Sequence, residues 1–223
     1  MAQDVARYGP DIPTESELKL CGNVEGKRVL ELGSGAQSSI AFAKQGAHTI
    51  AVDSSPERLA ELRSRSDAEE VKVELHESDL ADLAFVRADS IDMAFSSLAF
   101  DLVEDLNRVF RQVHRVLKTE APLVFSVPHP AYDMVDDESQ EPLLIRRSYF
   151  DHEPIDYELG GIPFTDYHHT VSDLFTGLTR ANFRVDTVLE PEPDSKGPHS
   201  WFWRDPFRFV PRTLIIRARK EGL

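Results

Sequence analysis

The sequence predicts a doubly wound α/β fold, an open and mostly parallel seven-stranded sheet with helices on both faces and one antiparallel strand near its edge. Short apolar runs alternate with amphipathic segments along most of the chain, which is typical of strand–helix–strand units. A glycine-containing turn, Gly33-Ser34-Gly35, follows the first run. The last two apolar runs, 184–190 and 210–218, have no helix between them, so they can pair antiparallel.

The first half of the chain supplies the first four strands. Residues 29–32 are a short apolar run suited to a buried parallel strand, and residues 38–44 are a small-residue segment suited to a helix packed closely on the sheet. Ser55-Pro56-Glu57 combines a serine cap, a proline at the first helical position and an acid, which predicts a helix start. The other strands of this half are expected at 48–52, 71–75 and 91–95.

The second half begins with the clearest helical pattern of the chain. Apolar side chains recur at helical spacing over residues 101–118, with arginines on the other side. A fifth strand is expected at 123–127, where Pro128-His129-Pro130 stops it. A further helix is expected at 170–181, before the two final strands.

The whole chain, residues 1–223, is predicted to be a single domain, because its length suits one large core. Residues 1–25 are expected to form an N-terminal lid segment, in which Thr14 and Glu17 make a capping box for a short helix. Residues 129–168 are acidic and rich in proline and glycine. We interpret them as an insertion over the active-site face.

Composition limits the partners of this chain. The net charge of −14 disfavours nucleic acid, because phosphate contacts supply most of that affinity. No run approaches the roughly 20 apolar residues of a membrane span. One cysteine, Cys21, excludes a disulfide framework, and the N-terminus lacks a signal-peptide pattern, so we expect a cytoplasmic protein. The acidic run Asp133, Asp136, Asp137 and Glu138 lacks the glycine turn of a calcium loop, so no metal site is expected. The oligomeric state stays open.

Polar residues stand at the carboxyl ends of successive predicted strands, where ligands bind in such sheets. The helix after Gly35 points free N–H groups at an anion. Asp53 follows Gly33 by twenty residues, where an acid accepts hydrogen bonds from a ribose diol. Asp79 can accept from an adenine amino group, and the N–H of Leu80 can donate to a ring nitrogen. These residues predict a nucleoside-bearing ligand.

The segments VLELGSGAQ, IAVDSS, HESDLADL and SIDMAFSSLAF resemble those of class I S-adenosyl-methionine-dependent methyltransferases. The similarity is greatest to the small-molecule group related to ubiquinone and menaquinone biosynthesis enzymes, and it covers residues 26–128 best. It implies a Rossmann-like fold, S-adenosyl-L-methionine as cofactor and a small-molecule acceptor with an oxygen, nitrogen or carbon nucleophile. The cofactor-binding residues it implies are Glu31, Gly33, Ser34, Gly35, Gln37, Asp53, Ser54, Asp79, Leu80 and Ser96.

Two positions of the turn depart from that family. Ser34 replaces a common cysteine, and Gln37 stands where a third glycine is usual. Because glutamine has a long side chain, Gln37 is expected either to crowd the cofactor or to hydrogen-bond its carboxylate.

Histidines supply the candidate general bases, because imidazole exchanges protons near neutral pH. His129 follows the fifth strand, His168 is the last residue of the insertion, and His169 comes directly after it. Each has a structural alternative: His129 can order the Pro-His-Pro turn, and His168 or His169 can cap a helix.

Two other functions are compatible with the same fold. A catalytically silent cofactor-binding or partner-binding protein would bind the ligand without turnover. A nicotinamide-dependent oxidoreductase is disfavoured, because none of the tyrosines has the lysine four residues later that short-chain enzymes use, and Ser38 occupies the last position of G-x-G-x-x-G.

Overall fold

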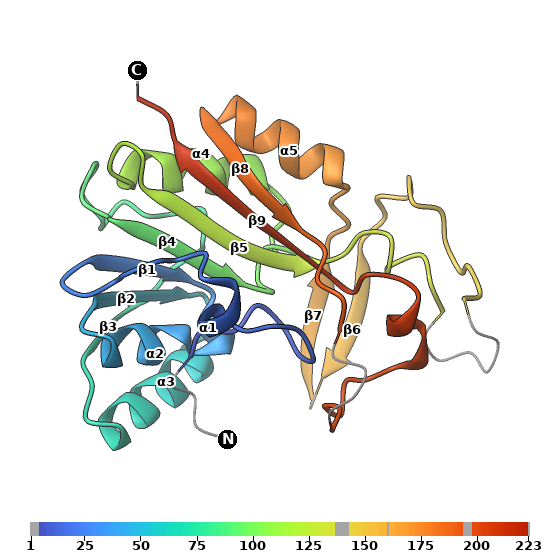
Figure 1. Ribbon diagram of the computed structural model, residues 1–223, viewed down its shortest axis with the longest axis horizontal. Coiled ribbons are helices and arrows are strands. Elements are labelled where there is room, and N and C mark those ends of the chain that lie inside the picture. The colour runs from blue at the N-terminus through green and yellow to red at the C-terminus, as the bar shows by residue number, and fades with distance from the viewer. Residues whose placement is uncertain (1–4, 137–142, 160, 194–197, 223) are drawn as a thin grey trace.

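The computed structural model describes residues 5–136, 143–159, 161–193 and 198–222. A seven-stranded sheet with the order β3-β2-β1-β4-β5-β9-β8 runs through it (Figure 1). All its strands are parallel except β9, which pairs antiparallel with both β5 and β8. The predicted fold class is thus confirmed. The strands are β1 (Arg28–Leu32), β2 (His48–Asp53), β3 (Val73–Glu77), β4 (Met93–Ser97), β5 (Pro122–Pro128), β8 (Phe183–Leu189) and β9 (Thr213–Lys220).

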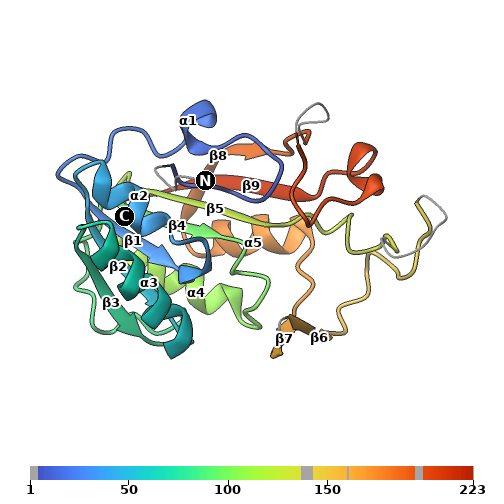
Figure 2. The ribbon, with the colours of Figure 1, turned by 90° about the horizontal axis from the view of Figure 1, so that it is seen from below.

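Helices cover both faces of the sheet (Figure 2). The described N-terminal segment packs with α2 on one face, and α3 packs beside them on β2 and β3. α4 and α5 lie together on the opposite face, where they bury the larger apolar cluster. The helices are α1 (Glu15–Leu18), α2 (Ser38–Lys44), α3 (Pro56–Ala68), α4 (Leu106–Val116) and α5 (Val171–Arg180), with short 3-10 turns at Ser34–Ala36 and Asp205–Arg208.

Four predicted elements begin at least two residues later in the chain than expected, and β4 and β9 do so at Met93 instead of 91 and at Thr213 instead of 210. Local hydrogen bonds explain the other two. The α4 helix was expected from residue 101 but starts at Leu106, because the side chain of Asp105 accepts a hydrogen bond from the Arg108 N–H and caps it there. Strand β3 starts at Val73 instead of 71, because the N–H of Val71 still donates to Ser66 at the end of α3. In both cases local hydrogen bonds override the apolar spacing.

The N-terminal segment is part of the core. The predicted capping box of Thr14 and Glu17 is present at α1. Tyr8 is fully buried, its hydroxyl donates to Glu15, and its ring lies 5.5 Å from that of Phe95 on β4. The segment therefore packs against one face of the sheet along much of its length.

The insertion contains a hairpin that sequence periodicity did not indicate. Strands β6 (Ile155–Leu159) and β7 (Ile162–Asp166) pair antiparallel and form a separate two-stranded sheet. Figure 1 shows this hairpin beyond the carboxyl ends of the main strands. The N–H of Tyr167, directly after β7, donates to the carbonyl of Asp101 at 2.8 Å. That bond fixes the end of the hairpin to the turn between β4 and α4.

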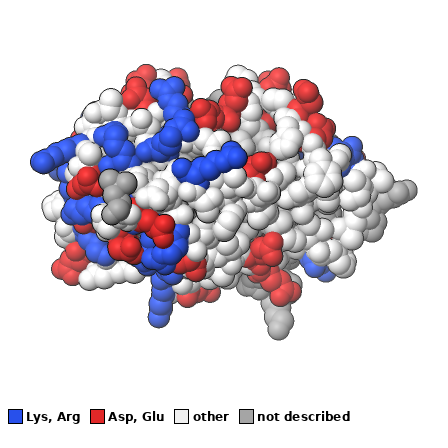
Figure 3. All heavy atoms as spheres, turned by 90° about the horizontal axis from the view of Figure 1, so that it is seen from above, with Lys and Arg blue, Asp and Glu red and all other residues white. Residues whose placement is uncertain are grey.

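Charge is unevenly distributed on the surface. Figure 3 shows Lys and Arg gathered at one end of the molecule, interleaved with Asp and Glu, while the other end is largely uncharged. On the final strand, Arg217 and Arg219 both bond Asp186 at 2.7 Å, and Lys220 bonds Asp89 at 2.6 Å. These cations are already paired with carboxylates. Within the described residues, no helix is long and apolar enough to cross a membrane.

Candidate active site

The turn after β1 requires glycine at its first position. Gly33 has φ +83°, a conformation that L side chains rarely adopt. A Cβ there would lie 2.3 Å from the Cβ of Ala99, in the segment after β4. The N–H of Gly33 donates to the carbonyl of Val52 on β2. Gly33 therefore lets the β1 turn approach both neighbouring strand ends, whereas a Cβ on Gly35 would meet open space.

Asp53, the last residue of β2, joins two turns. Its Oδ2 accepts from the N–H of Ser34 at 2.7 Å and from the Ser34 hydroxyl at 2.8 Å. Its Oδ1 accepts from the N–H of Ser55 at 2.9 Å, which leaves this oxygen room for another donor. The carboxylate is 3% exposed and faces a cavity. It can thus accept a ligand hydroxyl while holding the β1 turn in place.

A cavity of about 350 Å³ lies at the carboxyl ends of the first strands, and we call it the first cavity. Its lining brings together Gly33, Asp53, Ser54, Asp79 and Leu80, as the sequence predicted. Asp79 is exposed, and its Oδ1 accepts from the Ala81 N–H. Lining residues that sequence reasoning missed include Arg58, Ala99, Glu104, Arg108 and Tyr167. Their positions depend on the packing of α3, the β4–α4 turn and the hairpin.

Four other predicted residues lie behind that lining. Glu31 is fully buried, and its carboxylate accepts from the N–H groups of Ser38 and Ser39, which caps the start of α2. Burial raises the pKa of Glu31 to about 6. Ser96 is also buried, and its hydroxyl donates to the carbonyl of Leu32 at 2.8 Å. These two residues, with Ser34 and Gln37, contact the backbone or the side chains that support the cavity.

Gln37 occupies a backbone conformation that suits glycine. Its φ is +52° and its ψ is 33°, in the left-handed region. The side chain turns toward α3, where its Nε2 donates to Glu61 at 3.0 Å, and its Oε1 is buried without a partner among the described residues. A residue at positive φ thus stands where a third glycine is usual, and Gln37 is not among the lining of the first cavity. That Gln37 either crowds the cofactor or bonds its carboxylate stays a prediction.

Replacing Gln37 with glycine is expected to give a more stable protein than replacing it with alanine, by about 1 kcal/mol in the free energy of unfolding. Both variants lose the bond to Glu61, so their difference isolates the cost of a Cβ at positive φ. Urea unfolding of the two variants measures it. Equal stabilities would show that the turn relaxes out of the left-handed region.

A second cavity of about 420 Å³ adjoins the first and shares Glu104 and Tyr167 with it. Phe110 and Leu174 give it apolar walls, and His152, His168, His169 and Asp173 supply polar groups. Both volumes lie in the range of small-molecule sites. The arrangement therefore offers two adjoining compartments at the carboxyl edge of the sheet.

His129 organises the turn after β5. Its Nε2 lies 2.8 Å from Glu190, and its Nδ1 accepts from the N–H of Ala131 at 3.1 Å. An imidazole with both nitrogens in such bonds has no lone pair free for a substrate proton. His129 is absent from the lining of both cavities. The geometry favours the structural alternative for this residue.

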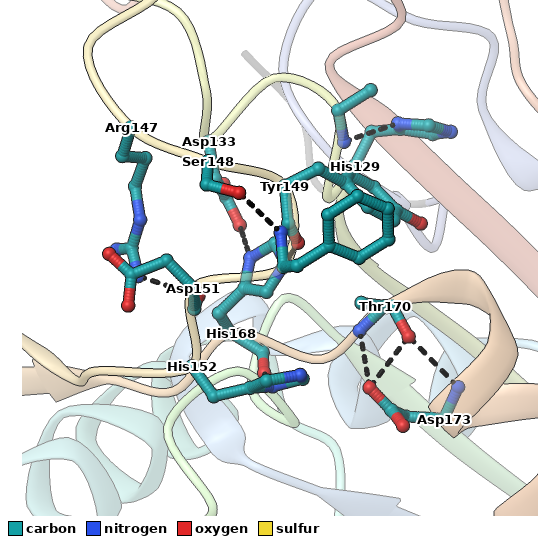
Figure 4. A network of polar contacts seen from close by, with 12 residues as sticks. His129, Asp133, Arg147, Ser148, Tyr149, Asp151, His152, His168, Thr170 and Asp173 are labelled. Atoms are coloured by element: carbon teal, nitrogen blue, oxygen red, sulfur yellow. Dashed lines mark hydrogen bonds and ion pairs between the residues drawn. The ribbon is translucent and has the colours of Figure 1, made fainter.

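His168 is held at both ring nitrogens (Figure 4). Its Nε2 donates to the carbonyl of Tyr149 at 2.9 Å, and its Nδ1 lies 2.8 Å from Asp133. The hydrogen bond to Asp133 raises the pKa of His168, so the imidazolium is favoured. A doubly donating imidazolium fastens the insertion to the segment before α5, and in that state it cannot accept a proton.

His169 differs from its neighbour. Its Nε2 donates to the carbonyl of Val103 at 2.9 Å, and burial lowers its pKa. The ring is therefore neutral near pH 7 and lines the second cavity. The described residues contain no group of three or more His, Cys, Asp or Glu that could hold a metal ion. Asp137 and Glu138 of the acidic run lie outside the described residues.

Comparisons with known proteins agree with this arrangement. Residues 30–125 match the family model of a methyltransferase domain. The structure superposes on a candidate S-adenosylmethionine-dependent methyltransferase of Listeria monocytogenes with a TM-score of 0.76 and 25% identity, over 93% of this chain and 98% of that one. An S-adenosylmethionine-dependent methyltransferase of Mesorhizobium loti superposes with a TM-score of 0.71 and 27% identity, over 92% of this chain and 96% of that one. An uncharacterized protein of Haemophilus influenzae is 23% identical over 220 residues, which are 91% of this chain and 85% of the relative.

Proposed function

We propose that this chain, an S-adenosylmethionine-dependent methyltransferase, transfers the methyl group to a small-molecule acceptor held in the second cavity. One observation carries the proposal: the first cavity gathers Gly33, Asp53, Asp79 and Leu80, and it adjoins a second cavity of small-molecule size. When bound, the cofactor supplies a methyl group already activated on a sulfonium. The protein then has to align the acceptor with it and exclude water.

The first cavity has groups that fit the cofactor. Oδ1 of Asp53 can accept from a ribose hydroxyl, and Asp79 keeps an exposed carboxylate oxygen for an adenine amino group. Gly33 brings backbone close to the cavity without a Cβ in the way. Glu31, Ser34, Gly35, Gln37 and Ser96 are proposed to support these groups or the turn that carries them.

The insertion is proposed to cover this site. The guanidinium of Arg58, which lines the first cavity, lies 5.1 Å from the ring centre of Phe164 on β7. Tyr167 lines both cavities. These contacts support the proposal that the hairpin shields the transfer from water. The N-terminal segment, residues 1–25, is still proposed as a lid, although its described residues pack on one face of the sheet and none lines either cavity.

The acceptor is proposed to carry an oxygen, nitrogen or carbon nucleophile. The resemblance to ubiquinone and menaquinone biosynthesis enzymes rests on the motifs of residues 26–128, which hold the cofactor side. Nucleic acid is disfavoured by the net charge of −14 and by the pairing of Arg217 and Arg219 with Asp186. The single cysteine, Cys21, supports a reducing compartment, the cytoplasm.

Incubating the protein with methyl-labelled S-adenosylmethionine and a cell extract tests the proposal. We expect the label in metabolites that pass a dialysis membrane, and none in protein or nucleic acid. Label in a macromolecule would contradict the small-molecule acceptor. Binding of S-adenosylhomocysteine without any label transfer would support the silent cofactor-binding alternative. Binding of NADH instead would support the oxidoreductase.

A further inference from the structure

A small cavity of about 10 Å³ lies beside the two larger ones, and we call it the acidic niche. Asp101, Asp133 and Asp166 line it together with Tyr167 and His169. Tyr167 also lines both larger cavities, and His169 also lines the second one. The niche therefore lies at their junction, beside the carboxyl end of β5. Its volume suits one water-sized group.

Two of the three carboxyls in the niche form no ion pair with a cation of the described residues. Asp133 pairs with His168 at 2.8 Å, which balances its charge. Oδ1 of Asp101 is buried and has no hydrogen-bond partner within the described part of the chain. Asp166 is half-buried and lines the same niche. Burying a carboxylate without a partner is costly, so such a pair either shares a proton or awaits a cation.

The surroundings explain why this pair holds protons. Burial and the charge of Asp166 raise the pKa of Asp101 to about 7, and burial raises that of Asp166 to about 6. The positive charge of Arg58 on α3 partly offsets the rise in the pKa of Asp101. The rise in the pKa of Asp166 is partly offset by the charges of His168, Arg147 and Arg146. Burial and the charges of Asp101 and Asp166 raise the pKa of Tyr157 on β6 to about 12.

Once both acids have ionised, an organic cation would balance their charge. The described residues provide no set of ligands for a metal ion, as noted above. An alcohol would leave the negative charge unbalanced, and a carboxylate would be repelled. A protonated amine matches the niche in size, in charge and in its several N–H donors.

We propose that Asp101 and Asp166 form a subsite for a protonated amine, and that the nitrogen of this amine is the methyl acceptor. The inference rests on the proposed methyl transfer and deepens it by naming the substrate class. It also assigns Asp101 as the general base, a role for which the sequence analysis considered His129 and His168.

The chemistry balances without another reactant. An ammonium has no lone pair, so its N–H bond must break first, and the proton passes to the Asp101 carboxylate. The nitrogen lone pair then forms a bond to the methyl carbon while the carbon–sulfur bond breaks and its electron pair stays on sulfur. The product is a methylated ammonium and a neutral thioether. Asp101 then returns its proton to solvent.

Calorimetry with three probes of one shape tests the subsite: benzylamine, benzyl alcohol and benzoate. The protein is first saturated with S-adenosylhomocysteine. We expect benzylamine to bind at least about tenfold more tightly than benzyl alcohol at pH 8, and benzoate not to bind. Benzylamine affinity should rise between pH 5 and pH 8, because Asp101 and Asp166 ionise in that range while the amine stays protonated.

Three variants identify the groups responsible. Asp101→Asn and Asp166→Asn should each lose at least about tenfold in benzylamine affinity and keep the affinity for S-adenosylhomocysteine. Glu158→Gln removes an exposed charge from the same hairpin and should change neither the benzylamine affinity nor the S-adenosylhomocysteine affinity. Equal binding of benzylamine and benzyl alcohol, or unchanged binding in both Asn variants, would overturn the amine subsite. Failure of S-adenosylhomocysteine to bind the unmodified protein would instead overturn the proposed function.

Discussion

The protein is expected to lose stability as pH rises through about 7, and replacing Asp101 with asparagine is expected to prevent much of that loss. In the folded protein the pKa of Asp101 is raised to about 7, above its value in the unfolded chain. The folded state therefore holds this proton more tightly, so its contribution to stability is complete below about pH 4. That contribution is lost as pH rises through about 7, because the buried carboxyl then ionises without a bonded cation.

The expected size follows from the shift. A change of about three pKa units corresponds to roughly 4 kcal/mol, and coupling to Asp166 spreads part of it over both acids. We therefore expect Asp101→Asn to be more stable than the unmodified protein at pH 8 by roughly 2–3 kcal/mol, and similar to it at pH 4.

Urea unfolding at a series of pH values measures this difference. His168 also has a raised pKa, so its protonation contributes stability that is lost at higher pH. Because His168 titrates in both proteins, its contribution cancels in the difference between their free energies of unfolding. Glu158→Gln, an exposed acid of the hairpin, is the matched control and should follow the unmodified curve. Parallel curves for Asp101→Asn and the unmodified protein would show that this carboxyl ionises freely in the fold.

Replacing Asp53 with alanine is expected to weaken binding of S-adenosylhomocysteine by about 2–3 kcal/mol, if the carboxylate accepts from the ribose hydroxyls. The structure adds a second effect. Asp53 also holds the N–H groups of Ser34 and Ser55, and removing it leaves these donors without their partner. The free energy of unfolding should therefore fall as well, by about 1–3 kcal/mol.

A companion variant separates the two effects. Ser34→Ala removes only the hydroxyl that bonds Oδ2 of Asp53 and leaves the Ser34 N–H bond in place. It should lower stability slightly and leave ligand affinity within about threefold. Glu57→Gln removes an exposed charge near the start of α3 and controls for net charge. Calorimetry measures the ligand affinity, and urea unfolding measures the free energy of unfolding. Full affinity in Asp53→Ala would place the ribose elsewhere.

The cofactor side of the site was predictable because it is local in sequence. Each strand of the parallel sheet ends at the same edge, so residues that directly follow β1, β2 and β3 must lie near one another. That rule placed Gly33, Asp53 and Asp79 correctly beside one cavity. It could not tell which polar side chains face the cavity and which support it, since Glu31 and Ser96 turn into the core.

The acceptor side was not predictable in the same way. Asp101 and Asp166 are distant in sequence, and only the docking of the hairpin through the Tyr167–Asp101 backbone bond brings their carboxyls into one niche. The sequence did not indicate that the ring nitrogens of the two candidate histidines are hydrogen-bonded to Glu190, to Asp133 or to backbone groups. Burial and pairing of a side chain are properties of the packed fold.

The sequence by itself predicted the seven strands of the main sheet, the antiparallel pairing of the last two and the glycine turn after β1, because apolar periodicity and glycine positions act within short segments. Tertiary structure decided where α4 begins, how the β6–β7 hairpin forms, how Gln37 is accommodated at positive φ, and that Oδ1 of Asp101 has no partner among the described residues. Those outcomes depend on contacts between segments far apart in the chain, and desolvation gives them their chemical effect.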